Sequence, residues 1–251
     1  MTKRKVGPHV QRRSVVINIR NGREKVRKKY KSKMLSAFQE IADKEADAIS
    51  KEANKILSER SDKKLESFIN EFYNDFEPVI SELFAPVGLK YAEAMRFIVE
   101  KEVDQELTAD ELAELIEEIQ YYLDGAASQY VGYSKKFLLS ALEKSVESVV
   151  ERVESWRENR PEMAKDEHMT GIESLTAFSV VLMTGYRLKW YAVGKSCPIC
   201  KKLNGRTVLK KTSFFNKAGE EFKDTAGSVA VFRQTKYPPI HKGCDCIVAA
   251  G

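Results

Sequence analysis

The stretch that decides the fold of the C-terminal part reads Cys197-Pro198-Ile199-Cys200 and, after a long insertion, His241-Lys242-Gly243-Cys244-Asp245-Cys246. All four cysteines of the protein and one of its three histidines lie in it. Two residues between cysteines allow a turn that points both thiolates at one ion about 2.3 Å away. Soft thiolates with an imidazole select zinc over magnesium or calcium. The sequence therefore predicts a structural Zn²⁺ site drawn from Cys197, Cys200, His241, Cys244 and Cys246. The spacing does not decide which donor is left out of the tetrahedron.

Three other interpretations of the cysteines are less favoured than zinc. Unrelated buried cysteines, which behave as small hydrophobes, would not be expected to cluster in one stretch. A disulfide pair needs an oxidising compartment, and the N-terminal residues show no secretory signal. A Cys-x-x-Cys redox motif normally opens a helix in a βαβ unit, whereas these cysteines are expected between strands and are followed by further metal donors. Structural zinc is the favoured interpretation.

Length and composition set the broad class of the protein. Its 251 residues allow one large domain or two small ones, and 43% hydrophobic residues suffice for a core. The 31% of charged residues is typical of long, solvated helices. No apolar run approaches the length needed to cross a bilayer. We expect a soluble protein without a membrane segment, made in a reducing cytoplasm where thiolates remain free to bind metal.

Charge is distributed unevenly along the chain. Residues 1–33 hold 13 Lys and Arg and one acid, Glu24, which is a charge of +12, and the rest carries −7, for a net +5. Blocks of like charge are usually mobile interaction tails. The pattern predicts a basic, flexible arm over 1–33 that binds a polyanion such as DNA or docks on an acidic protein surface. The alternative is a solvated tail with no specific partner.

Apolar residues recur at helical spacing over most of the first 185 residues. Thr108 and Glu111 form a capping box that opens one of the helices. Pro78 is expected to kink or divide a helix and Pro86 to break one, while residues 14–19 read as a short strand before an Asn21-Gly22 turn. The predicted helices cover about 24–56, 62–83, 89–100, 108–125, 134–159 and 170–184, the last ended by Gly185.

After Gly185 the pattern changes to short strands. Alternation predicts a strand over 187–193, and further strands are expected at 207–209 and 246–249, with a hairpin over 213–223 that turns at 216–219. The predicted fold class is α+β: a mainly helical N-terminal body with a small, zinc-pinned α+β C-terminal module. The predicted divisions are a basic flexible arm, 1–33, a helical domain, 34–165, and an α+β domain, 166–251.

The order of signals in the C-terminal module resembles the C-terminal domain of phage Mu F-like minor head proteins, the head morphogenesis proteins of tailed bacteriophages. The match covers roughly residues 170–250. The signals, in chain order, are Lys189-Trp190, Cys197-Pro198-Ile199-Cys200, Leu203-Asn204-Gly205 and Pro238-Pro239-x-His241-x2-Cys244-Asp245-Cys246.

This resemblance implies a structural virion component in the head interior or at the portal vertex. It would be made in the host cytoplasm, be present in multiple copies, act in head assembly and be able to leave the particle with the DNA. The implied partners are the portal protein, the major capsid protein or both, with packaged DNA as a partner of the basic N-terminal arm. The resemblance carries Cys197, Cys200, His241, Cys244 and Cys246 over as the family's metal-type motif.

Catalysis is not predicted. The sequence shows no nucleophile with a matching base, and His168 is expected to be solvated in a polar linker. Where the family that this chain resembles usually has an Ala-Arg-Thr-Glu type helix, this chain keeps a glutamate, Glu173, but lacks the preceding arginine. That departure argues against carrying over catalysis from the family's distant ADP-ribosyltransferase-like members. An HNH nuclease would need a second histidine beside His241. The alternatives that remain are a zinc-containing nucleic-acid-binding protein and, less favoured, an ADP-ribosyltransferase-like enzyme.

Overall fold

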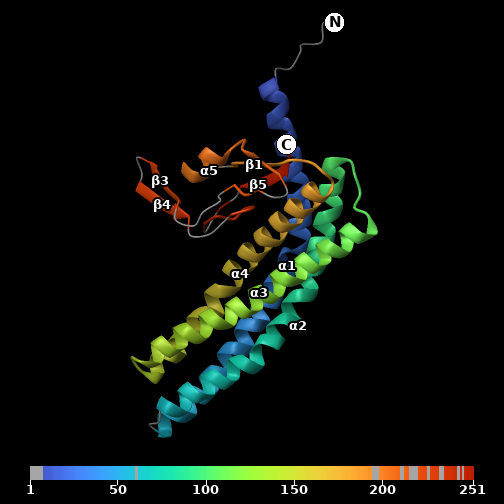
Figure 1. Ribbon diagram of the computed structural model, residues 1–251. Coiled ribbons are helices and arrows are strands. Elements are labelled where there is room, and N and C mark those ends of the chain that lie inside the picture. The colour runs from blue at the N-terminus through green and yellow to red at the C-terminus, as the bar shows by residue number, and fades with distance from the viewer. Residues whose placement is uncertain are drawn as a thin grey trace, which may run out of the picture. The chain divides into compact units, whose positions relative to one another are not determined.

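The computed structural model describes the backbone of residues 8–59, 62–193, 198–209, 212–214, 220–224, 227–231, 235–241, 244 and 246–251. Side chains are described for the same residues except 8–15, 58, 59, 62 and 220–231. Four long helices occupy most of the chain (Figure 1): α1 (Pro8–Glu59), α2 (Asp62–Val103), α3 (Ala109–Leu142) and α4 (Val146–Met183).

The C-terminal residues form a short helix and five short strands. The elements are β1 (Leu188–Tyr191), α5 (Pro198–Leu203), β2 (Thr207–Val208), β3 (Glu220–Asp224), β4 (Gly227–Val231) and β5 (Ile247–Ala250). Strand β1 lies between β2 and β5 in an antiparallel sheet, and β3 pairs with β4 as a separate hairpin. The predicted α+β class, mainly helical with a small C-terminal sheet, is confirmed. We call residues 188–251 the C-terminal module.

The chain folds into two compact units, and these are not three consecutive domains. Unit 1 comprises residues 1–29, 91–115 and 170–251, and unit 2 comprises residues 30–90 and 116–169. The boundaries predicted at 33 and 165 therefore fall near two of the four crossings between units. Because the long helices run through these crossings, each of α1 to α4 contributes to both units.

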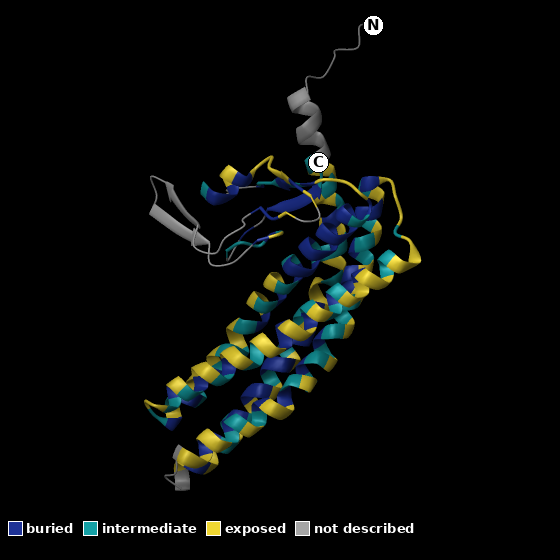
Figure 2. Ribbon diagram, in the orientation of Figure 1, coloured by how far each residue is buried: buried dark blue, intermediate teal, exposed yellow. Residues whose placement is uncertain are grey.

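Unit 2 is a packed set of helical segments with one buried face on each. Figure 2 shows buried and exposed positions alternating along the helices, as amphipathic segments require. A buried carboxylate also lies among them: Glu45 accepts hydrogen bonds from the hydroxyls of Tyr73 (2.5 Å) and Tyr130 (2.7 Å) and pairs with Arg160 (3.2 Å). Apolar burial therefore drives the packing of unit 2, and the polar contacts of Glu45 fix how its helical segments are aligned along one another.

The N-terminal predictions need correction. Residues 14–19 are not a strand and Asn21-Gly22 is not a turn, because both lie inside α1, which begins at Pro8. The interpretation of 1–33 as a flexible arm is wrong from residue 8 onward, since this segment is helical and Arg23 is only 2% exposed. The physical reason is tertiary: partners far along the chain hold one side of the helix. Residues 1–7 lie outside the described part.

The predicted helix breaks are also wrong in several places. Helix α2 continues through Pro78 and Pro86, and α4 continues through Pro161. An interior proline costs about 3 kcal/mol, but Pro78 and Pro86 are exposed, while Phe76, Ile80 and Phe84 keep a buried stripe in register. Packing of that stripe outweighs the lost hydrogen bonds.

The predicted C-terminal end of α3 is wrong, whereas the predicted start of α3 and the predicted end of α4 are right. Helix α3 does not stop at Gly125, and the break lies instead before Val146, where the Ser145 hydroxyl accepts a hydrogen bond from the Ser148 amide at 3.1 Å. The Thr108–Glu111 capping box is confirmed, with bonds of 2.8 and 3.3 Å in the two directions. The end of α4 is confirmed as well: Gly185 has a φ of 81°, and the Tyr186 amide bonds the Val181 carbonyl at 3.1 Å.

The strands of the C-terminal module follow the predictions except at the hairpin. Strands β1, β2 and β5 lie within one or two residues of the expected positions, and β4 was not among the expected strands. The hairpin was expected over 213–223, whereas the observed pair is Glu220–Asp224 with Gly227–Val231. The predicted turn at 216–219 lies outside the described residues. Since Glu220–Asp224 is charged at four of five positions, it carried little strand signal.

Candidate metal centre

Three cysteines of the C-terminal module gather in one place. Cys200 comes from α5, and Cys244 and Cys246 come from the segment before β5. Their sulfur atoms all lie within 4.8 Å of one another, and the three residues are 1%, 7% and 2% exposed. Three buried thiols at this separation are close enough to bind one metal ion.

Strand β1 brings these cysteines together. On one side it pairs with β5, which follows Cys246, in a register that places Trp190 opposite Val248. On its other side it receives the turn that follows α5, where the Gly205 amide donates to the Trp190 carbonyl at 2.8 Å. The left-handed φ of Gly205, 84°, makes this turn possible. Both halves of the cysteine motif are therefore tied to the same strand.

His241 lies beside one of the three thiols. Its Nε2 atom is 3.4 Å from Cys200 Sγ, and its carbonyl accepts a hydrogen bond from the Cys244 amide at 3.2 Å. The structure thus brings three of the five predicted donors, the thiols of Cys200, Cys244 and Cys246, within 4.8 Å of one another and places a fourth, His241, beside Cys200. The fifth, Cys197, lies outside the described residues.

The thiols are electrostatically coupled. Hydrogen bonding with Cys200, and then with Cys246, lowers the pKa of Cys244 to about 2, while the same bond with Cys244 raises the pKa of Cys200. The hydrogen bonds within the cluster therefore favour the thiolate form of Cys244. Thiolates are the form that ligates a metal, so the cluster is primed to exchange its remaining protons for a cation.

A buried indole borders the cluster, and sequence reasoning did not assign it a role there. Trp190 is completely buried, and its Nε1–H has no hydrogen-bond partner among the described residues. The pKa of Cys246 is lowered by bonding with Cys200 and, less, by Trp190, while Cys244 and burial raise it, to about 11 overall. The indole N–H is thus near enough to favour the Cys246 thiolate without forming a full hydrogen bond, and outer contacts of this kind support metal–thiolate bonds. The only sequence signal was the alternation that placed Trp190 on one face of a strand.

The second half of the Cys-x-x-Cys motif lies in a helix and not between strands, contrary to the prediction. The residues after Cys197 are not extended, because α5 begins at Pro198, so the Cys-x-x-Cys does open a helix. The helix is only six residues long, however, and β1 joins antiparallel neighbours with no βαβ unit. Cys244 and Cys246 also stand beside Cys200, as metal ligation requires and a dithiol pair does not.

The remaining candidates for chemistry have structural partners. His168 is not solvated in a linker but lies inside α4, partly buried against Phe38 and Phe84, and bonds the Tyr122 hydroxyl at 3.1 Å. Burial lowers its pKa to about 4. Glu173 is paired with Arg27 at 3.8 Å and bonded by the Tyr91 hydroxyl at 3.4 Å. His9 lies in the part of α1 for which only the backbone is described.

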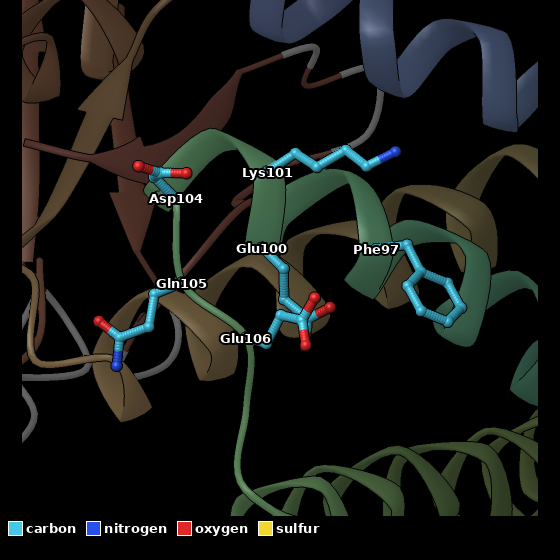
Figure 3. A pocket seen from close by; sticks show the side chains of 6 residues that line it. All are labelled: Phe97, Glu100, Lys101, Asp104, Gln105 and Glu106. Atoms are coloured by element: carbon cyan, nitrogen blue, oxygen red, sulfur yellow. The ribbon is translucent and has the colours of Figure 1, made fainter.

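A shallow pocket of about 250 Å³ lies at the end of α2 and is lined by Phe97, Glu100, Lys101, Asp104, Gln105 and Glu106. Figure 3 shows the side chains of Asp104 and Lys101 extending in opposite directions. Glu100 instead serves the fold, accepting bonds from Arg96 (2.7 Å) and from the Leu107 amide (3.0 Å). The pocket has no arrangement of a nucleophile and a base.

Among the residues that the structure describes, no helix is both long and apolar enough to cross a membrane. Comparisons with family models, with curated proteins and with solved structures found no match.

Proposed function

We propose that this chain is a structural minor head protein of a tailed bacteriophage, of the Mu F-like class. The order of the Trp190, Cys197-x-x-Cys200, Asn204-Gly205 and His241-x2-Cys244-x-Cys246 signals carries the proposal. The local roles of these residues support it. Trp190 lies at the centre of the sheet, Asn204 and Gly205 make the turn that returns to β1, and the thiols gather beside it.

In this proposal the metal is Zn²⁺, held by Cys200, Cys244 and Cys246 with His241 or Cys197 as the fourth donor. Zn–S bonds of about 2.3 Å and a Zn–N bond of about 2.0 Å give tetrahedral edges of about 3.8 Å between sulfurs and 3.5 Å between sulfur and nitrogen. The Cys200–Cys244 and Cys200–His241 separations are 3.8 and 3.4 Å. Four protein donors close the coordination sphere, so the ion would stabilise the module without an open catalytic position.

The proposed role is assembly without catalysis. The chain would attach to the portal, the major capsid protein or both, at the portal vertex or in the head interior, in several copies per virion. Glu173, the residue that matches the ADP-ribosyltransferase-like relatives, is engaged by Arg27 and Tyr91. This pairing supports a structural use of its carboxylate and gives no reason to expect NAD turnover.

Coexpression with the portal and major capsid proteins of the same phage tests this role. We expect the chain to cosediment with procapsids and to stay bound in ~0.5 M salt, where attraction between exposed charges is screened. A chain that remains in the supernatant at all salt concentrations contradicts the proposal. NAD hydrolysis that is lost in Glu173→Gln but retained in Glu167→Gln, an exposed carboxylate in the same helix, would contradict it in favour of an enzyme.

A further inference from the structure

Residues 16–29 of α1, which we call the N-terminal segment, are held in unit 1 mainly by polar contacts. All of their side chains are described, and Arg23 is the one among them that is buried; the next buried residue of α1 is Met34. Four β-branched residues, two asparagines and a glycine lower the helix propensity of the segment, and it carries six cations against a single acid, Glu24. Its helical order therefore depends on the partners that its arginines find elsewhere in unit 1.

Arg23 joins the N-terminal segment to two other elements of unit 1. It makes a two-pronged ion pair with Glu102 of α2, at 2.9 and 2.6 Å, and donates to the Val248 carbonyl of β5 at 3.0 Å. Arg27, about one turn further on, lies on the same side of the helix and donates to Thr170 Oγ1 of α4 at 3.1 Å. The bond to Val248 links the N-terminal segment to the C-terminal module.

This bond occupies the outer edge of the sheet. Trp190 directs its amide and carbonyl away from β5, to Arg206 and Gly205, at 2.9 and 2.8 Å. Val248 stands opposite Trp190 in the antiparallel register, so its own amide and carbonyl point away from β1. Val248 is completely buried, and a buried carbonyl at a sheet edge needs a donor. Arg23 supplies that donor in place of a further strand.

We infer that the metal cluster of the C-terminal module controls the docking of the N-terminal segment. Val248 lies two residues after Cys246, so the strand edge that receives Arg23 directly follows a candidate metal ligand. The coupling rests on the zinc site proposed above. Loss of the ion unfolds the C-terminal module, and Arg23 then loses the Val248 carbonyl.

Loss of that bond releases the N-terminal segment. The ion pair of Arg23 with Glu102 becomes accessible to water once β5 is gone, and ion pairs in water contribute little to stability. The segment then changes from an ordered helix with one buried arginine to an exposed chain with six cations. Because coupling between two sites is reciprocal, docking of the N-terminal segment in turn tightens zinc binding.

Hydrogen–deuterium exchange of the full chain, zinc-loaded and after chelation, tests this coupling. Mass spectrometry compares the amides of residues 16–29 with those of residues 116–142, the part of α3 that belongs to unit 2. We expect chelation to speed exchange at 16–29 by about 10-fold or more, within the usual range of coupling between sites. Exchange at 116–142 should not change, because unit 2 holds no part of the metal cluster.

The variant Arg23→Ala distinguishes this coupling from a general loosening of unit 1. In its zinc-loaded form, residues 16–29 should exchange nearly as fast as in the chelated wild type, and chelation should add little. Arg20→Ala makes the same change at an exposed position three residues earlier and should keep the zinc-dependent protection. By reciprocity, Arg23→Ala should bind zinc about 5-fold or more weakly than Arg20→Ala.

Two results overturn the coupling and leave the zinc site intact. One is exchange at residues 16–29 that is equal with and without zinc in the wild type, which needs no variant to fold. The other is zinc-dependent protection, or zinc affinity, that is the same in Arg23→Ala as in Arg20→Ala. A chain that binds no zinc overturns both the coupling and the zinc site, and the procapsid test is independent of all three results.

Discussion

Unit 2 and the C-terminal module are held together in different ways. Unit 2 is built from long helical segments whose buried residues repeat every three or four positions, and its contacts are spread over many side chains. The C-terminal module has strands of two to five residues and gathers its buried thiols at one point. The folded state of the C-terminal module therefore depends on a few local interactions, whereas that of unit 2 depends on many dispersed contacts.

The small size of the C-terminal module explains the difference. A segment of about 60 residues buries too little surface to be secure on its own, and a metal is one of the usual remedies. The protein offers a direct way to follow each region, because Trp156 lies in unit 2 and Trp190 in the C-terminal module. Single-tryptophan variants report on one region at a time.

Metal removal is expected to have the largest effect, and it should unfold the C-terminal module while unit 2 stays folded. Apparent binding free energies of structural zinc are about 10–16 kcal/mol, so losing the ion should unfold the C-terminal module. We expect a chelator, or Cys200→Ser, to abolish the native Trp190 fluorescence while Trp156 fluorescence and most of the helix signal persist. Metal analysis should give one zinc per wild-type chain. A metal-free protein with native Trp190 fluorescence would contradict the proposed metal site. It would also contradict the view that the C-terminal module and unit 2 are stabilised differently.

The same measurement identifies the fourth donor. Cys197→Ser and His241→Asn each remove one candidate. Only the variant that loses a true ligand should lose the ion; the other should bind nearly as tightly as wild type. Because His241 Nε2 already lies 3.4 Å from Cys200 Sγ, we expect His241→Asn to lose the metal. Retention of zinc in His241→Asn and its loss in Cys197→Ser would assign the site to four cysteines.

The next largest effect concerns Arg23, which connects α1 to the C-terminal module. Arg23→Leu leaves the Glu102 carboxylate, 9% exposed, without its partner and the Val248 carbonyl without a donor. Breaking a buried ion pair from one side costs about 3–5 kcal/mol. We expect Trp190 to unfold at lower denaturant concentration and Trp156 to be little affected. Arg20→Leu is the matched control, since Arg20 is exposed three residues away. Equal effects of the two substitutions would show that the contacts of Arg23 with Glu102 and Val248 do not stabilise the C-terminal module.

The sequence predicted what short-range patterns determine. Helical periodicity found the long helices, the Thr108–Glu111 box and Gly185 marked two of their ends, and cysteine spacing found the thiol cluster. It failed where distant partners decide the outcome. The β-branched residues of 14–19 favour a strand locally, but they continue a helix that Arg23 holds in place further along. Pro86 favours a break, but the buried stripe of α2 overrides it. Arg23 looked like any other basic residue of a tail, because Glu102 and Val248 are far from it in the sequence.

A smaller effect, expected in unit 2, comes from His168. Burial lowers its pKa to about 4 in the folded protein, against about 6.5 when unfolded. Between these values the unfolded chain binds more protons, so stability falls as the pH drops from about 6.5 towards 4, by about 2–3 kcal/mol. Denaturation followed by Trp156 measures this loss. In His168→Phe, which keeps a ring against Phe38, stability should depend less on pH in this range. A variant with the wild-type pH profile would show that another group titrates.

The smallest effect tests whether Trp190 supports the metal site through its N–H as well as through its ring. Trp190→Phe keeps most of the buried ring and its edge contact with Phe214, whose centroid is 5.0 Å away, but removes the only indole donor beside Cys246. Loss of an outer-shell contact typically lowers metal affinity about 10-fold or more. We expect a zinc affinity at the mild end of that range, with the melting of unit 2 unchanged. Trp156→Phe, which removes the other indole of the protein, controls for the loss of a tryptophan as such. If Trp190→Phe binds zinc as tightly as Trp156→Phe does, the indole N–H contributes nothing to the site, and Trp190 serves only the packing of the sheet.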